Sequence, residues 1–266
     1  MQGFFRCSDI DSRMIRHTFS LAPSVGKKRE MDLWESGVRD WEDFLGADRV
    51  CAISDARKAR CDLAIEHAMD LLKERDADGL NNILPRHDQW RIFGEFRDSA
   101  AYLDIETDGL DRDSLVTVVT VHKKNETVTL THGRGLNSRS LSDALEGASM
   151  LVTFNGSCFD VPVLKNSFPG LNLNMPHLDL RFASLKVGLR GGLKNLEASL
   201  GITRGDNVID VDGFEAVRLW RRWDRDGNLD ALEKLIEYNK ADTVNLEYIT
   251  EIIYPKLVRE HAGFIW

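Results

Sequence analysis

The chain has 266 residues, of which 42% are hydrophobic and 29% are charged, and its formal net charge is −8. This composition is typical of folded globular proteins and excludes collagen-like, mucin-like and disordered chains. The excess of acidic residues argues against a protein that coats nucleic acid, because such proteins are basic. The length corresponds to one large domain or two ordinary ones, at roughly 150 residues each.

The sequence carries no membrane or secretory signature. No run of about 18 apolar residues is present, so we expect no transmembrane helix and no membrane partner. The N-terminus lacks a basic region followed by an apolar core, so we expect no secretory signal. The four cysteines, Cys7, Cys51, Cys61 and Cys158, are widely spaced. This spacing predicts reduced thiols, no structural zinc site and a cytoplasmic location.

Residues 1–96 are predicted to form a helical accessory domain. Apolar residues at intervals of three and four predict one amphipathic helix over 54–72, with Ser54 as its N-cap. The segment 76–79, which reads DADG, predicts the end of this helix. Aromatic residues at intervals of three then predict a short docking helix: Trp90, Phe93 and Phe96.

Residues 97–266 are predicted to form an α/β domain. Alternating and β-branched residues predict strands over 101–105, 115–122, 127–131 and 150–154, with a hairpin turn at 124–126. Helices are predicted over 142–147, 162–166, 193–200 and 229–253. Three strands in meander order, followed by a helix, a strand and further helices, predict a mixed sheet flanked by helices.

Paired carboxylates end the first predicted strand. Asp104 and Glu106 are two residues apart, so their side chains share one face of the strand. Carboxylate oxygens are ligands that hard divalent cations prefer. The alternative is a solvated strand end, but the apolar neighbours Tyr102, Leu103 and Ile105 place this strand in a core.

A third carboxylate follows the last predicted strand. The sequence NGSCFD places Asp160 shortly after that strand, and Gly156 permits a tight turn from strand to helix. Pro162 then lies in the first turn of the helix, where proline is favoured. Taken alone, this pattern favours a simple helix cap for Asp160.

A tyrosine and an aspartate share one face of the last predicted helix. Tyr238 and Asp242 are four residues apart, beside an apolar stripe. An aspartate at the edge of a core is costly unless it is paired or bound to a metal. The alternative is a partly exposed aspartate beside a tyrosine that only fills the core.

Together these patterns predict one acidic site. Four carboxylates in fixed order can gather oxygen ligands for two divalent cations about 3.5–4 Å apart, an arrangement that promotes phosphodiester cleavage. The Tyr238 hydroxyl can orient the attacking water. The four predicted ligands are Asp104, Glu106, Asp160 and Asp242.

The three motifs, DIETDGL, FNGSCFD and YNKAD, resemble those of the ribonuclease-H-like DEDD exonucleases. Glu237 stands where the histidine subclass would have histidine, so the resemblance is to the tyrosine subclass. It covers residues 98–255. Residues 193–202 and 212–238 more narrowly resemble YprB-type ribonuclease-H-like proteins. The resemblance implies a ribonuclease-H-like fold preceded by a small helical domain.

The same resemblance implies a 3′–5′ exonuclease that uses two Mg²⁺ or Mn²⁺ ions on single-stranded or frayed DNA or RNA. Asp104, Glu106 and Asp242 would bind the first ion. Asp104 would also bind the second, with Asp160 contributing directly or through water. Tyr238 would position the nucleophilic water, which makes these five residues the catalytic set.

The resemblance also implies contacts to the substrate. Thr107 and Leu110 would hold the terminal nucleotide, with Leu110 as an apolar wedge under a base. Asn155 and Phe159 would line the nucleotide pocket. Lys194 would contact a phosphate, and its alternative is an exposed helix lysine. Two alternatives to catalysis stay open: an inactive nucleic-acid-binding module of the same fold, and an adaptor protein with acidic residues on its surface.

Residues 19–45 resemble a degenerate helix-hairpin-helix element. In that motif a glycine-containing turn exposes backbone N–H groups to a phosphate at a helix N-terminus. Lys27, Lys28 and Arg29 would add non-specific attraction to nucleic acid. Ser24 replaces the usual first glycine of the turn. The alternative is a small helical pair that packs against the nuclease domain.

Overall fold

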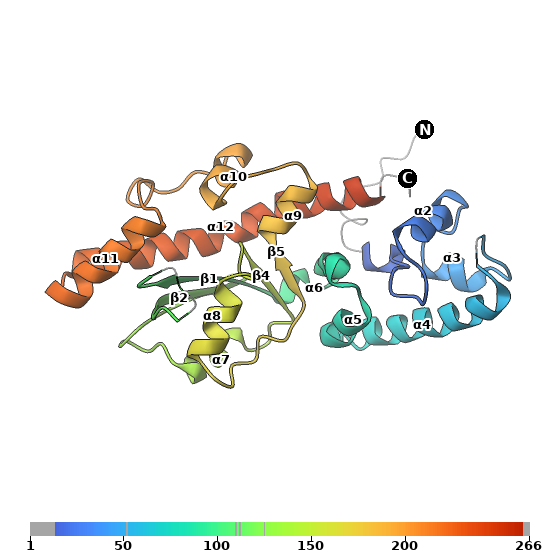
Figure 1. Cartoon of the computed structure of the whole chain (residues 1–266), viewed down its shortest axis with the longest axis horizontal. Coiled ribbons are helices and arrows are strands. Elements are labelled where there is room, and N and C mark those ends of the chain that lie inside the picture. The colour runs from blue at the N-terminus through green and yellow to red at the C-terminus, as the bar shows by residue number, and fades with distance from the viewer. Residues whose placement is uncertain (1–13, 52, 110, 112, 125, 263–266) are drawn as a thin grey trace. The chain divides into compact units, whose positions relative to one another are not determined.

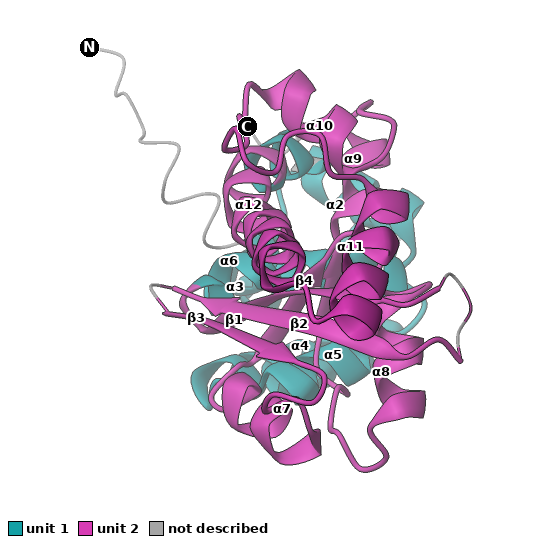
Figure 2. Ribbon diagram, turned by 90° about the vertical axis from the view of Figure 1, so that its left-hand side faces the viewer, with its two compact units in different colours: residues 1–97, 254–266 teal, residues 98–253 magenta. Residues whose placement is uncertain are grey.

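The computed structural model describes residues 14–51, 53–109, 111, 113–124 and 126–262. The chain divides into two compact units, residues 1–97 with 254–266 and residues 98–253, which Figure 2 colours separately. Residues 254–266, which the sequence analysis places in the C-terminal domain, thus group with the N-terminal residues. Among the described residues, no helix is both long enough and apolar enough to span a membrane.

The first unit is built from short helices. Within α4, the predicted helix over 54–72 is confirmed, with Ser54 at its N-cap. The prediction that residues 76–79 end this helix is wrong in its detail. They begin the next helix, because the Asp76 carboxylate accepts a hydrogen bond from Gly79 N at 2.8 Å and so caps α5. The elements are η1 (Met14–His17), α2 (Lys27–Glu35), α3 (Trp41–Gly46), α4 (Asp55–Lys73), α5 (Ala77–Ile83), η2 (Arg86–Ile92) and α6 (Phe93–Phe96), followed by η3 (Arg97–Ser99) at the boundary.

The hairpin resemblance falls on α2, α3 and the turn before them. Ser24 has a φ of 65°, a left-handed conformation that glycine adopts at little cost. The Arg29 guanidinium donates to the Ser24 carbonyl within this turn. One of the basic side chains expected to attract nucleic acid is therefore engaged by the loop itself.

The second unit is an α/β domain, as predicted. Its five-stranded sheet has the order β3-β2-β1-β4-β5. The β1–β2 and β2–β3 pairs are antiparallel, and the β1–β4 and β4–β5 pairs are parallel. The elements are β1 (Ala100–Thr107), β2 (Val116–Lys123), β3 (Glu126–Thr131), α7 (Ser138–Leu145), β4 (Met150–Thr153), α8 (Asp160–Ser167), β5 (His177–Asp179), α9 (Leu180–Lys186), α10 (Leu193–Leu200), α11 (Gly213–Asp226) and α12 (Leu229–Ala262).

Helices cover both faces of this sheet (Figure 1). On one face α7 and α8 pack against alternate residues of β1, namely Ala101, Leu103 and Ile105. On the other face α11 and α12 form a second core with Val118 of β2. Because side chains alternate along a strand, Asp104 and Glu106 lie on the α12 face. The mixed sheet flanked by helices that the sequence predicted is confirmed.

The last helix extends beyond its prediction. The sequence placed its end at residue 253, before Pro255, but α12 continues to Ala262. Within the first unit, the Tyr254 ring packs on Trp90 and Phe93, with centroid distances of 6.0 and 5.0 Å. These contacts hold the helix past the proline, which by itself favours a helix end.

Candidate active site

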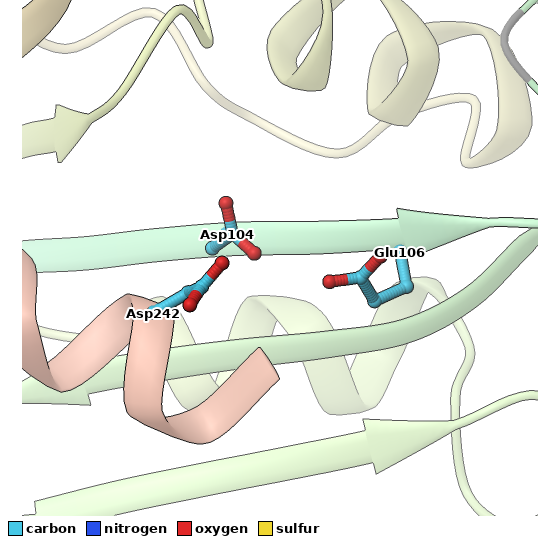
Figure 3. A group of neighbouring side chains, drawn as sticks. All are labelled: Asp104, Glu106 and Asp242. Carbon is cyan, nitrogen blue, oxygen red and sulfur yellow. The ribbon is translucent and has the colours of Figure 1, made fainter. Parts of the chain in front are cut away.

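Two elements bring the acidic residues of the second unit together. Asp104 and Glu106 extend from one face of β1, and Asp242 extends from α12 above that face (Figure 3). One carboxylate oxygen from each residue lies within 4.8 Å of the others. Figure 3 shows the Asp104 and Asp242 carboxylates facing each other, with Glu106 reaching back along the strand. The arrangement can enclose a small cation in an all-oxygen site.

Asn239, one residue after Tyr238, ties α12 to this strand. Its Nδ2 donates to Asp104 Oδ2 at 2.8 Å, and its side chain also hydrogen-bonds Glu106. Asn239 is fully buried. The sequence analysis missed it, although its place between the motif residues was the available signal.

The proximity of the carboxylates makes ionisation costly. Loss of hydration on burial, and then the charges of Asp160, Glu106 and Asp242, raise the pKa of Asp104 well above its usual value. Burial, followed by the Asp242 charge, does the same to the pKa of Glu106. Burial raises the pKa of Asp242 to about 7, although the Arg204 guanidinium lowers it. Such shifted carboxylates are typical of functional sites and are relieved by a bound cation.

Asp160 falls outside the group of three but lies close to it. It is the first residue of α8 and is buried. Burial raises its pKa to about 7, while hydrogen bonds from its own backbone N–H and that of Ile105 lower it. Its charge is the largest single charge effect on the pKa of Asp104. Asp160 is therefore an electrostatic neighbour of the strand carboxylates, and more than the simple helix cap that its motif alone favoured.

The turn before α8 is held in place by Asp179, which the sequence analysis missed. The Asp179 carboxylate accepts hydrogen bonds from the backbone N–H groups of Asn155 and Ser157, at 2.8 and 3.0 Å. Asn155 has a φ of 66°, and a side chain at Gly156 would collide with Thr153. The only signal for Asp179 in the sequence was an aspartate that ends a very short strand, β5.

A cavity of about 500 Å³ opens beside these residues. Arg181 Nη1 donates to Asn155 Oδ1 at 2.5 Å at its edge. Two acidic residues, two aromatic rings and an arginine therefore share one hollow, a combination suited to a nucleotide. The lining residues are Asp104, Ile105, Phe154, Asn155, Phe159, Asp160, Arg181, Leu185, Gly191 and Gly192.

The other residues predicted to contact the substrate are Thr107, Leu110 and Lys194, and neither Thr107 nor Lys194 is among the described residues that line this cavity. Thr107 is buried, and its hydroxyl donates to the Gly109 carbonyl at 2.6 Å. The Lys194 ammonium donates to the Ile209 carbonyl at 3.0 Å. Leu110 lies outside the described residues. Asn155 and Phe159 are thus the predicted substrate contacts that the structure brings to the cavity.

Tyr238 lies next to Asp242 and hydrogen-bonds its carboxylate. Burial, followed by the Asp242 charge, raises the pKa of its hydroxyl, so the hydroxyl stays protonated at neutral pH. The Arg204 guanidinium lies 5.4 Å from the centre of its ring. The sequence did not predict a role for Arg204 or its partner Glu197, because neither belongs to the three acidic motifs and neither is near Tyr238 in the chain.

The site residues fit a divalent metal. Asn239 Oδ1 is buried without a hydrogen-bond donor among the described residues, whereas Asp242 Oδ1 has the Arg204 guanidinium 2.6 Å away. Unsatisfied oxygens of this kind are costly unless a ligand meets them. An all-oxygen donor set suits Mg²⁺ or Mn²⁺ better than a softer metal. Asp104, Glu106 and Asp242 would hold such an ion.

Residues 101–254 match the family model of the RNase H superfamily. The match spans more than half of the chain, and the chain belongs to this superfamily. Its fold is a nuclease fold whose members bind nucleic acids and usually divalent metals. The ribonuclease-H-like fold expected from the sequence motifs is therefore confirmed. No curated protein matches the chain.

Proposed function

We propose that this protein is a metal-dependent 3′–5′ exonuclease of the tyrosine DEDD subclass and the YprB type. It would hydrolyse phosphodiester bonds of single-stranded or frayed DNA or RNA. The observation that carries the proposal is the convergence of Asp104, Glu106 and Asp242 within 4.8 Å, with Tyr238 on the same helix as Asp242. Residues 97–266 would form the nuclease domain, and residues 1–96 a helical accessory domain.

The acidic residues and Tyr238 have different roles in this proposal. Asp104, Glu106 and Asp242, with Asp160 beside them, would hold two divalent cations. When bound, such ions supply an activated water and stabilise the leaving oxygen. The Tyr238 hydroxyl, kept protonated by its raised pKa, orients the attacking water through hydrogen bonds and does not act as a base. Asp160, Tyr238 and Asp242 are buried, and their low-dielectric surroundings strengthen the charge interactions within the site.

The cavity supports a nucleotide as the substrate. Phe159 offers an aromatic ring for a base, and Asn155 offers an amide beside it. Stacking on aromatic rings is tolerant of base identity, which suits an enzyme that removes successive nucleotides. Arg181 adds a positive charge at the same edge. Thr107, Leu110 and Lys194 are proposed to complete the contacts to the terminal nucleotide and its phosphate.

The test is degradation of single-stranded DNA and RNA, each labelled at the 5′ end, in the presence of Mn²⁺. We expect a ladder of shortened, labelled products from the wild type and intact substrate with Asp242→Asn. Asp143→Asn is the matched control, because Asp143 is exposed on α7 and belongs to the opposite face of the sheet. A ladder that persists in Asp242→Asn would refute the proposal. Binding without degradation by the wild type would support the inactive binding module instead.

A further inference from the structure

A buried arginine lies against the acidic site from outside the sequence motifs. Arg204 belongs to the segment between α10 and α11, and its side chain is only 4% exposed. Its Nη1 lies 2.6 Å from Asp242 Oδ1. Its guanidinium also lies 5.4 Å from the centre of the Tyr238 ring. One side chain thus contacts both residues that α12 contributes to the proposed chemistry.

The other side of Arg204 is anchored. Its Nε donates to Glu197 Oε2 at 2.6 Å, and Glu197 of α10 is buried. Glu197 Oε1 in turn accepts a hydrogen bond from Asn245 Nδ2 at 2.8 Å. Asn245 is on α12, one turn after Asp242. A closed path of contacts therefore runs from α12 through Glu197 and Arg204 back to α12.

The Glu197–Arg204 pair would not reduce the negative charge that the proposed site offers to cations. Glu197 and Arg204 carry opposite charges and neutralise each other. The four carboxylates of the proposed site can then supply four negative charges once two divalent cations are bound. The Glu197–Arg204 pair can therefore orient the Asp242 carboxylate without changing the net charge of the site. Carboxylates that bind metals commonly depend on such outer hydrogen-bonding partners for their orientation.

Stability alone does not account for a buried arginine here. Removing two charges from water costs free energy, and well-packed apolar residues often serve equally well or better. Arg204 Nη2 also has no hydrogen-bond partner among the described residues. Arg204 therefore bears an unfavourable desolvation free energy at the position where it contacts Asp242 and Tyr238.

We propose that Arg204 is a positioning residue that fixes the Asp242 carboxylate and the Tyr238 ring relative to each other, with Glu197 as its anchor. The inference rests on the proposed function, because it concerns the same site. Arg204 acts through Asp242 and Tyr238 and does not itself hold the cation.

The test measures Mn²⁺ binding by calorimetry on folded Arg204→Met protein, with no nucleic acid present. We expect affinity to fall about 10–100-fold, the usual effect of losing an outer partner of a metal ligand. Arg139→Met is the matched control, because Arg139 faces Asp143 at 4.0 Å in an exposed pair. Unchanged or tighter Mn²⁺ binding by Arg204→Met would overturn the inference, and tighter binding would identify Arg204 as a competitor of the metal.

Two further variants keep the test decisive if Arg204→Met does not fold. Arg204→Lys keeps the charge but loses the planar group that spans two carboxylates, so we expect an intermediate loss of Mn²⁺ affinity. Glu197→Gln keeps the shape but weakens the anchor, and we expect a loss in the same direction. Wild-type affinity in both variants would overturn the inference.

The nuclease assay adds a second readout. For Arg204→Lys we expect kcat to fall while KM for the nucleic acid stays within about threefold, because ground-state binding of the substrate is unaffected. If the wild type binds Mn²⁺ but degrades no nucleic acid, the proposed function is wrong. The Mn²⁺ affinities of the Arg204 variants still test the role of Arg204 in that case. If the wild type binds no Mn²⁺, both fail.

Discussion

Each of the two units gathers a group of acidic side chains, and the two groups differ in how many carboxylates share one cation. In the first unit, Glu30 is almost completely buried and accepts two hydrogen bonds from Arg91, at 2.8 and 2.9 Å. Its Oε1 also accepts a hydrogen bond from Phe19 N at 2.7 Å. Asp88 pairs with the same guanidinium at 3.0 Å. The two carboxylates of this group share one guanidinium, and each of them contacts it directly.

In the second unit, more carboxylates surround a single cation, and among the described residues only Asp242 of the three site carboxylates pairs with it. Asp104, Glu106 and Asp242 lie within 4.8 Å of one another. The nearby cation, Arg204, is shared with Glu197. Loss of hydration, followed by the neighbouring negative charges, raises the pKa values of all three carboxylates. Carboxylates therefore stabilise the fold of the first unit, whereas in the second unit they leave negative charge that a bound cation would neutralise.

The largest expected effect follows from removing one of the carboxylates that lack a cation. Asp104→Asn should lower nuclease activity by about a thousandfold or more, equivalent to ~4 kcal/mol in the activation free energy. The reason is that Asp104 lies between Glu106, Asp160 and Asp242 and would contact both ions. The measurement is the rate of mononucleotide release in Mn²⁺. Asp143→Asn, at an exposed site, should retain wild-type activity, and equal losses in both variants would contradict the prediction.

The balanced group of the first unit should respond through stability. Glu30→Gln removes the carboxylate charge that accepts two hydrogen bonds from Arg91 and leaves Asp88 as the charged partner of that buried guanidinium. We expect the free energy of unfolding to fall by about 3 kcal/mol, as measured by urea denaturation. Arg139→Gln, at the exposed pair with Asp143, should change it by less than about 0.5 kcal/mol. A Glu30→Gln protein as stable as the wild type would remove the contrast between the two units.

The metal-free protein should also show a distinctive pH dependence. The pKa values of Asp160 and Asp242 are raised to about 7, above the value of about 3.9 in an unfolded chain. The folded state therefore holds protons that the unfolded state releases, so these groups lower stability as pH rises from about 4 to about 7. Thermal unfolding with a chelator present should show this decline. Saturating Mn²⁺ should reduce it, and an identical decline with and without the ion would contradict the interpretation.

The smallest expected effect is a gain. Glu106→Gln removes one of the mutually repelling charges, so the metal-free protein should be more stable by about 1 kcal/mol at pH 8. The sign is opposite to that of Glu30→Gln, although both changes replace a glutamate that lies against other charged groups. Urea denaturation of the two variants side by side compares them directly. A loss of stability in Glu106→Gln would show that its charge is compensated within the chain.

Short-range patterns predicted much of the fold and of the site. Alternation placed Asp104 and Glu106 on one face of β1, because the period of a strand is a local property of the backbone. The spacing of Tyr238 and Asp242 placed them together on α12 for the same kind of reason. The β1, β2 and β3 meander and the helical character of the first unit followed from the same periodicities.

What the sequence did not reveal depends on contacts between distant segments. The three residues of β5 are too few to show a period, and Asp179 at its end was missed with it. The extension of α12 past Pro255 depends on aromatic packing in the first unit. Arg204 and Glu197 lie outside the three acidic motifs, and only the packing of α10 and the following segment against α12 brings them to Asp242. The sequence determined by itself which residues share a face, because that is set by backbone geometry. The tertiary structure decided which faces meet, and therefore which carboxylates lack a cation, because charge balance depends on neighbours far apart in the chain.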